Sequence, residues 1–424
     1  MSNKLQNNPY IGTNDYLPDE FRKLQYIFSK WRNIAKKYGY QEYLTPVLEY
    51  AEIYEAKSGE DIKKELFILT DAGGRRLALR PEMTPSVTRL VTKVYGAETK
   101  PLRYFSIANF FRGEKPQKGR DREFWQLNID IFGSESIYSD LEILMSAIDL
   151  MRSFGAPTNS FILKLNHRKL IDFFLSNILN IESKELKSEV VRKLDKYKKL
   201  SREDFSKTLE ELGLNQTQIE LTEKWMTIEL NDLEKNFPNI TNNQGYKDII
   251  FLINTLEKLG YKENIEYSTE LIRGFDYYDG SIFEVFDLNP SFSRSLFGGG
   301  RYNGLAELFG NQKIPAVGYA PGSPISIFLD NWNLWPNFDD NTQNYFLPIL
   351  SDKYFIQTME LAQKLRQEGK ILETGVTISD IPKSLSYANK KKVEFVVIYG
   401  ENEIKNGEYI IKNMKTGEQN VYKL

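Results

Sequence analysis

The sequence predicts an α+β domain that contains an insertion of helices and is followed by a smaller α/β domain. Three stretches lead to this expectation. Residues 110–133 alternate apolar and polar side chains as a β-hairpin does, residues 169–237 are charge-rich with little alternation, and residues 345–424 return to a strand, helix and strand pattern. The chain has 424 residues, 41% of them hydrophobic, which suffices for two or three hydrophobic cores.

Composition excludes several kinds of chemistry. The chain has no cysteine, which removes disulfides and thiolate sites and fits a reducing, cytoplasmic location. Its one histidine, His167, is expected to be structural, at a strand-to-helix junction with Asn166 as the N-cap. The net charge of -2 provides no global field for nucleic acid, and no apolar run is long enough to span a bilayer. We therefore expect no membrane contact and no metal site built from the protein.

The chain begins with a predicted amphipathic helix over residues 18–38, whose apolar side chains recur at spacings of three and four. A strand over residues 40–50 follows and is interrupted by Pro46. Because proline cannot donate to a strand ladder, such a strand lies at an edge or an interface.

A strand-to-helix junction is predicted where residues 77–84 end at Thr84. Thr84 is expected to cap a helix that starts at Pro85. Glu82 and Thr84 would then lie at the mouth of the junction, a common place for a binding site. The alternative is that Glu82 only pairs with Arg80 or Arg89.

The predicted hairpin at residues 110–133 is the centre of the chain. Its second strand directs one set of side chains to an apolar back and another to a hydrated, hydrogen-bonding front: Trp125, Leu127, Ile129 and Ile131 on the first, Gln126, Asn128 and Asp130 on the second. The connecting loop, residues 115–122, holds four cations. A basic tip adds nothing to a core, so we favour a functional role over a solvated turn.

Helices are expected next. Residues 138–154 form a second amphipathic pattern, and residues 169–237 are predicted to be a helical insertion. The charged run at residues 192–202 is either a contact for RNA or a solvated helix face, and we favour the latter.

Two further stretches combine charge, tyrosine and glycine in β-rich sequence. Residues 271–278 read L-I-R-G-F-D-Y-Y, and the Asp279-Gly280 pair that follows predicts a tight hairpin turn within residues 266–288. Charged groups enter a core only when they are paired or used. Residues 297–305 read F-G-G-G-R-Y-N-G-L, where glycines allow close approach of backbone and ligand. Residues 318–329 then predict a glycine-rich strand that leads into a helix.

The last part of the chain is predicted to be a separate domain. Residues 1–335 form the first domain, residues 330–344 have linker composition, and residues 345–424 alternate strands and helices around a Val/Ile-rich strand at 394–399.

Together these stretches resemble the histidyl-tRNA synthetases, a family of class II aminoacyl-tRNA synthetases, over nearly the whole chain. Residues 40–50 are similar to motif 1, 110–133 to motif 2, 318–329 to motif 3 and 271–278 to the histidine-specific signature. The resemblance implies an antiparallel sheet flanked by helices, an anticodon-binding C-terminal domain and a homodimer through motif 1. It also implies histidine, ATP with Mg²⁺ and tRNA(His) as reaction partners.

The resemblance, with the chemistry it implies, assigns the site residues. Attack of a carboxylate on the α-phosphorus of ATP joins two anions, so arginines must absorb charge, and Arg112 and Arg273 are the expected catalytic pair. Glu114 is expected at the adenine amine and Arg120 at phosphate, which with Arg112 makes the ATP site. Histidine is expected to be held by Glu82, Thr84, Arg112, Gln126, Asp130, Arg273, Tyr277, Tyr278 and Tyr302. Of these, Gln126 and Asp130 would take the ammonium, and Tyr278 and Glu82 the imidazole.

The sequence departs from the family pattern in motif 3. Pro324 and Ile325 stand where a glutamate and an arginine are usual, which removes a cation from the ATP site unless Mg²⁺, Arg294 or Arg301 replaces it. Two alternatives therefore stay open. One is the histidine-binding regulatory subunit of ATP phosphoribosyltransferase, and the other is a general RNA-binding module, which leaves Arg273 and the glycine run unexplained.

Overall fold

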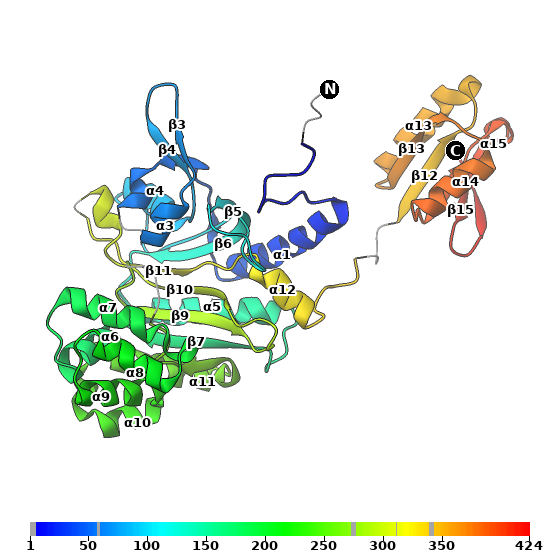
Figure 1. Cartoon of the computed structure of the whole chain (residues 1–424). Coiled ribbons are helices and arrows are strands. Elements are labelled where there is room, and N and C mark those ends of the chain that lie inside the picture. The colour runs from blue at the N-terminus through cyan, green and yellow to red at the C-terminus, as the bar shows by residue number, and fades with distance from the viewer. Residues whose placement is uncertain (1–5, 57–59, 273–276, 311, 339–342) are drawn as a thin grey trace. The chain divides into compact units, whose positions relative to one another are not determined.

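The computed structural model describes residues 6–56, 60–272, 277–310, 312–338 and 343–424. The chain divides into two compact units, residues 1–335 and residues 336–424 (Figure 1). Each unit has its own hydrophobic cores.

The first unit is built on a mixed sheet of eight strands. Their order across the sheet is β1 (Gln41–Glu42), β5 (Leu102–Phe111), β6 (Glu123–Phe132), β11 (Ala316–Tyr319), β10 (Ser295–Arg301), β9 (Ser281–Asp287), β7 (Phe161–His167) and β8 (Ile265–Tyr267). The outermost pairs, β1 with β5 and β7 with β8, are parallel, and the other pairs are antiparallel. The antiparallel sheet that was predicted is thus confirmed apart from its two edges.

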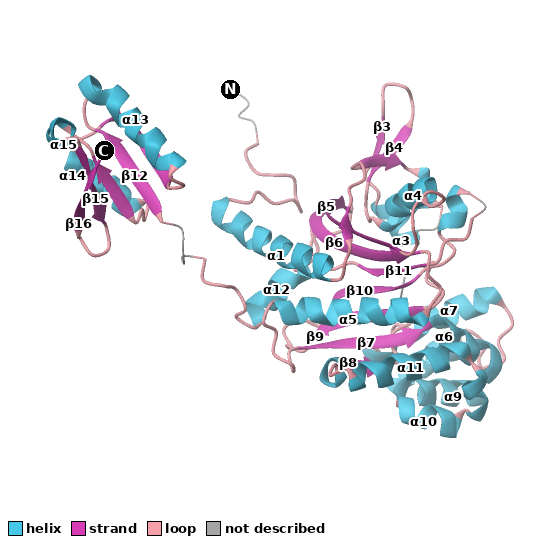
Figure 2. Ribbon diagram, turned by 180° about the vertical axis from the view of Figure 1, so that it is seen from behind, coloured by secondary structure: helices cyan, strands magenta, loops and turns pink. Residues whose placement is uncertain are grey.

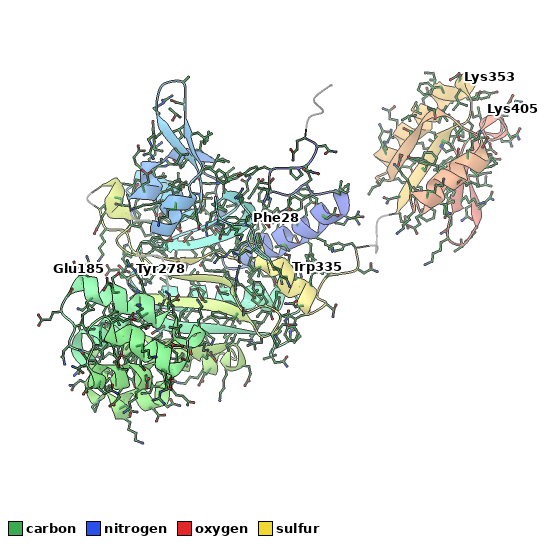
Figure 3. All side chains as sticks on the ribbon, in the orientation of Figure 1. Phe28, Glu185, Tyr278, Trp335, Lys353 and Lys405 are labelled. Atoms are coloured by element: carbon green, nitrogen blue, oxygen red, sulfur yellow. The ribbon has the colours of Figure 1, made fainter. Side chains whose placement is uncertain are left out.

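Two long helices cover one face of this sheet, which we call the back (Figure 2). They are α1 (Pro18–Lys37) and α5 (Ile137–Ser153), and the side chain of Ser136 caps α5 by accepting from the backbone of Tyr138. Phe28 of α1 packs on Trp125 with ring centroids 5.0 Å apart (Figure 3). Leu127, Ile129 and Ile131 join the same core, as their alternation predicted.

The opposite face, the front, is covered by α4 (Thr84–Val94), whose Val87 and Val91 pack with Phe110 and Phe132. Beside it lie a small sheet, β2 (Leu48–Tyr50), β4 (Arg76–Leu79) and β3 (Ile68–Thr70), and the short helices α2 (Glu52–Glu55) and α3 (Glu60–Glu65). The prediction that Thr84 is an N-cap was wrong. Met83 occupies the cap and Thr84 is already helical, because Pro85 fits either of the first two helical positions.

The predicted helical insertion is present and extends further than expected, to residue 258 (Figure 1). It contains α6 (Arg168–Phe173), a π-helical turn (Phe174–Ile178), α7 (Lys184–Leu194), α8 (Arg202–Glu210), α9 (Gln216–Thr227), α10 (Leu230–Asn236) and α11 (Gln244–Lys258). Lys198 pairs with Glu270 at 2.6 Å and Arg202 with Glu223 at 2.5 Å. These ion pairs fit the interpretation of residues 192–202 as a solvated helix face.

His167, and not Asn166, caps α6, which corrects the predicted cap. Nδ1 of His167 accepts from the backbone of Lys169 at 3.1 Å, while the Asn166 side chain accepts from the backbone of His167 at 2.8 Å. Nε2 of His167 lies 3.3 Å from Asp248 on α11. The one histidine is therefore structural, as expected.

The hairpin predicted at Asp279-Gly280 is absent from the described residues. The chain before this pair forms β8, which pairs with β7 in parallel, and β9 makes its hairpin with β10 instead. Asp279 donates its backbone N–H to Arg301, and the carbonyl of Gly280 accepts from Arg168. Both residues of the pair are thus hydrogen-bonded to remote parts of the chain.

The second unit is a sheet of five strands with helices. Its order is β13 (Ile371–Ile378), β12 (Asn344–Ile349), β14 (Phe395–Ile398), β15 (Glu408–Asn413) and β16 (Gln419–Lys423). The helices are α13 (Phe355–Gln367), α14 (Ile381–Lys390) and α15 (Glu401–Asn406). The three strands β13, β12 and β14 are parallel, which confirms the predicted α/β character. Across the described ranges, no helix combines the length and the apolar content that crossing a membrane requires.

Candidate active site

Three tyrosines meet on the front of the large sheet. Tyr277 and Tyr278 precede β9, and Tyr302 follows β10 (Figure 3 labels Tyr278). Their ring centroids are 5.0 Å apart for Tyr277 and Tyr278, 5.8 Å for Tyr277 and Tyr302, and 6.3 Å for Tyr278 and Tyr302. Such a cluster supplies flat apolar walls and three hydroxyl groups within a small volume.

Two buried carboxylates flank the tyrosines. The hydroxyl of Tyr277 donates to Glu82 at 3.0 Å, and the hydroxyl of Tyr302 donates to Asp130 at 2.5 Å. Glu82 is 3% exposed and Asp130 is 5% exposed. The front face was predicted to be hydrogen-bonding and hydrated. It is hydrogen-bonding, but at these two residues it is buried from water. Burial raises the pKa of Asp130 to about 7, although the bond from Tyr302 opposes the rise.

Thr84 joins this cluster, and Gln126 lies on the same face of β6 as Asp130. The side chain of Thr84 hydrogen-bonds Tyr277, and burial raises the pKa of that tyrosine well above its ordinary value. Gln126 shares the front of β6 with Asp130, and its amide donates to the carbonyl of Ala320 at 3.3 Å. The structure therefore brings together six of the residues expected to hold histidine: Glu82, Thr84, Asp130, Tyr277, Tyr278 and Tyr302, with Gln126 on the same strand face.

Arg112, directly after the first hairpin strand, lies near this cluster. Its Nε donates to the carbonyl of Pro81, the neighbour of Glu82, at 3.0 Å, and its guanidinium lies 5.3 Å from the ring centroid of Phe124. Both contacts hold the side chain while its terminal N–H groups keep donor capacity for an anion. Arg273, the second expected catalytic arginine, lies outside the described residues.

The basic loop of the hairpin is ordered by its own contacts. Arg120 pairs with Glu114 at 3.0 Å, so the two residues expected at ATP hold one another in this state. Arg122 donates to the carbonyl of Glu114 at 3.0 Å and to the hydroxyl of Tyr10 at 2.6 Å. The carbonyl of Gly12 accepts from the backbone of Arg122 at 2.7 Å. The segment before α1 thus supports the loop.

Two family models match this chain: histidyl-tRNA synthetase over residues 12–322 and an anticodon-binding domain over residues 343–424. Histidine–tRNA ligase of Leptospira biflexa is 37% identical over 422 residues, 98% of this chain and 95% of the relative. The enzyme of that name from Haloarcula marismortui is 34% identical over 413 residues, 96% and 94% of the two chains. The chain belongs to the histidyl-tRNA synthetase family.

Solved structures of the histidyl-tRNA synthetase family share the fold. Histidyl-tRNA synthetase from Nostoc sp. PCC 7120 superposes with a TM-score of 0.81 at 22% identity, covering 99% of this chain and 97% of that one. A Bacillus halodurans protein described as an ATP phosphoribosyltransferase regulatory subunit/histidyl-tRNA synthetase has a TM-score of 0.75 at 21% identity, with 91% and 97% covered. At these identities the likeness supports the fold alone.

In motif 3, the isoleucine that stands where the family usually has an arginine packs into the hydrophobic core. The predicted strand and helix are present as β11 and α12 (Pro324–Asn331), and Ile325 is fully buried in the main core. Arg301, one of the two replacement cations considered above, is not available. Its guanidinium is buried against Asp140 and donates to the carbonyls of Ser134 and Ser136.

Two features were not predicted: the buried ion pair of Arg301 and Asp140, and the hydrogen bonds that Arg122 of the hairpin loop donates to Tyr10 and Gly12. A signal for the pair was present, because Asp140 lies four residues before Leu144 and so falls on the buried stripe of α5, where a carboxylate needs a partner. No local pattern points from Gly12 to residues more than a hundred positions away.

Proposed function

We propose that this protein attaches histidine to its tRNA in two steps. A histidine carboxylate oxygen attacks the α-phosphorus of ATP, forming histidyl-adenylate as the bond to pyrophosphate breaks. A ribose hydroxyl at the 3′ end of the tRNA then attacks the activated carbonyl, its proton is lost, and AMP leaves. The family assignment and the near-complete match to histidine–tRNA ligases support this activity, which belongs with tRNA in the cytoplasm.

The observation that carries the proposal is the buried cluster of two carboxylates and three tyrosines near Arg112. Histidine presents an ammonium group, a carboxylate and a ring with two nitrogens. Glu82 and Asp130 can accept from the ammonium and from a ring N–H, and Tyr278 provides a third polar contact. A pocket with such buried polar groups rejects amino acids that leave them unpaired.

Arg112 and Arg273 are proposed to neutralise the charge that develops when the two anions react. Arginine holds two oxygens at once and keeps its charge, which suits a carboxylate next to a phosphate. Mg²⁺ enters as part of the ATP substrate, since it binds phosphates together with at most one or two carboxylates.

Pyrophosphate exchange tests the proposal. Purified protein should incorporate labelled pyrophosphate into ATP with histidine, and with no other amino acid. Arg112→Ala and Arg273→Ala should each reduce exchange by about two to three orders of magnitude, as lost transition-state donors do. Arg202→Ala, on the insertion, is the matched control and should retain full activity. Histidine binding without exchange would favour the regulatory-subunit alternative.

We also propose that the protein is a homodimer through the motif 1 region. Apolar side chains there are unusually exposed for a monomer surface: Leu44 at 70%, Leu48 at 45% and Tyr50 at 53%. Leu48→Glu should halve the mass measured by light scattering. Val376→Glu, at an apolar position of the second unit that is 93% exposed, is the control and should leave the mass unchanged. A wild-type monomer would contradict the proposal.

A further inference from the structure

Arg294 lies against the tip of the basic hairpin loop, although it comes from the distant connection between β9 and β10. Its Nη2 donates to the side-chain oxygen of Gln117. Gln117 and Arg120 close a tight turn, with backbone bonds of 3.0 and 2.8 Å in the two directions and a positive φ of 76° at Gly119. Arg294 therefore contacts the turn that carries Arg120, the loop arginine expected at phosphate.

Apolar packing fixes this arrangement. A Cβ at Gly119 would lie 3.1 Å from the Cδ1 of Ile327 and 3.4 Å from the ring of Phe292. Ile327 belongs to α12, and Phe292 is 6% exposed and part of the main core. The turn is thus seated between the motif 3 helix and the base of the segment that carries Arg294.

The arginines considered for the phosphates of ATP differ in how firmly they are already paired. Arg120 is paired with Glu114, Arg301 is buried with Asp140, and the eight residues of α12 contain no lysine or arginine. Arg294 is exposed, and among the described residues it bonds a neutral amide and forms no ion pair. An amide is a weaker partner than an anion, so a phosphate can replace Gln117 at low cost.

We propose that Arg294 binds the terminal phosphates of ATP next to Arg120 and supplies, from the β9–β10 connection, the cation that position 325 lacks. This inference rests on the proposed function. The arginine fork would leave Gln117 and donate to oxygens of the β- and γ-phosphates. It would then hold the pyrophosphate as its bond to the α-phosphorus breaks, while Arg112 and Arg273 act at the reacting carboxylate.

The KM values for ATP and histidine, measured on the full chain, test the proposed role of Arg294. In pyrophosphate exchange at saturating histidine, Arg294→Ala should raise the KM for ATP roughly 10- to 100-fold, the range for one charge-assisted contact. The KM for histidine should change less than about twofold, because the histidine pocket has other partners. Arg294→Lys keeps the charge but loses the planar guanidinium that can bind two oxygens at once. Its KM for ATP should lie between those of wild type and Arg294→Ala.

Gln117→Ala separates phosphate binding from a merely structural contact. It removes the bond that holds Arg294 to the turn but leaves the guanidinium in place, so the KM for ATP should stay within about twofold of wild type. An equal rise in both variants would show that Arg294 only positions the loop, and no rise in Arg294→Ala would show that it does not meet ATP. Either result overturns the proposal.

Calorimetry with Mg²⁺-ATP distinguishes this inference from the proposed function. If wild type shows no exchange, the ligase activity fails, yet ATP affinity can still be compared between wild type, Arg294→Ala and Gln117→Ala. Loss of affinity in Arg294→Ala alone upholds the inference, and equal affinities in all three refute it. Matching thermal unfolding curves ensure that the variants are folded.

Discussion

At the scale of single residues, the pocket depends on carboxylates that are kept away from water. Asp130 is enclosed by the sheet, by Tyr302 and by Gly318, where even a Cβ would come within 2.0 Å of its Oδ1. A charge in such a place is costly unless a cation arrives. The ammonium or protonated ring of histidine is a partner of that kind, so the free pocket is poised to take a cation.

This burial makes the stability of the free protein dependent on pH. Because the pKa of Asp130 is raised from 3.8 to about 7, its neutral form stabilises the fold at low pH, and that contribution is lost as the pH rises through 7. Relative to Asp130→Asn, wild type should lose stability from about pH 4 upward, by roughly 1 kcal/mol per pH unit at mid-range, and the loss should level off above about pH 7. Denaturant unfolding checks this, and parallel pH profiles would contradict it.

The sequence patterns account for where several of the expected site residues lie, but not for the side chains that they contact. The alternation of β6 placed Asp130 and Gln126 on one face, and the motifs pointed to Tyr277 and Tyr302. That Tyr277 bonds Glu82, 195 positions away, follows only from the fold. Arg301 shows the same limit, since its sequence neighbours do not reveal that Asp140 neutralises it.

At the scale of elements, the site depends on close contact between neighbouring strands. β11 pairs with β6 in a register that sets Gly318 opposite Asp130, and β10 lies beside β11 with Gly299 opposite Tyr319. A Cβ at Gly299 would lie 2.3 Å from the carbonyl oxygen of Gly318. In the glycine run, which was predicted to admit a ligand, Gly299 therefore admits a neighbouring backbone.

Gly318→Ala should damage both the fold and the pocket. The new Cβ would lie 2.5 Å from the carbonyl oxygen of Ile129 as well as against Asp130, and neither is the free end of a flexible chain. We expect the free energy of unfolding of the first unit to fall by about 1–3 kcal/mol, as it does in overpacked cores. The KM for histidine should rise as well. Gly96→Ala, with nothing within 4 Å of its Cβ, is the control. Equal stability of the two variants would contradict this account.

Elements with strong local patterns were predicted, and elements defined by remote pairing were not. The helices α1 and α5 and the strand β6 follow from periodicity, whereas the helical insertion was predicted only as a whole, from its composition, and with too early an end. The Asp279-Gly280 pair misled because β8 adds to β7 in parallel after a long helical excursion. Parallel pairing leaves no turn signal in the sequence between the strands.

At the scale of the whole molecule, the two units have separate cores. The second unit is held by its own clusters, one around Leu347, Leu361 and Val397 and another around Phe346 and Ala388. All of the pocket residues that the structure describes belong to the first unit. The chemistry of activation is therefore expected to survive without the second unit, while recognition of a large tRNA is not.

Deletion of residues 345–424 should separate the two half-reactions. Histidine-dependent pyrophosphate exchange should stay within a few-fold of wild type, because the pocket and the hairpin remain. Charging of tRNA should fall by about 100-fold or more in kcat/KM, since a second linked binding module contributes roughly that factor through effective concentration. The anticodon offers unstacked bases that such a module can read on their edges. A truncated protein that melts cooperatively but loses both activities equally would show that the second unit supports activation itself, and that the units are not functionally separate.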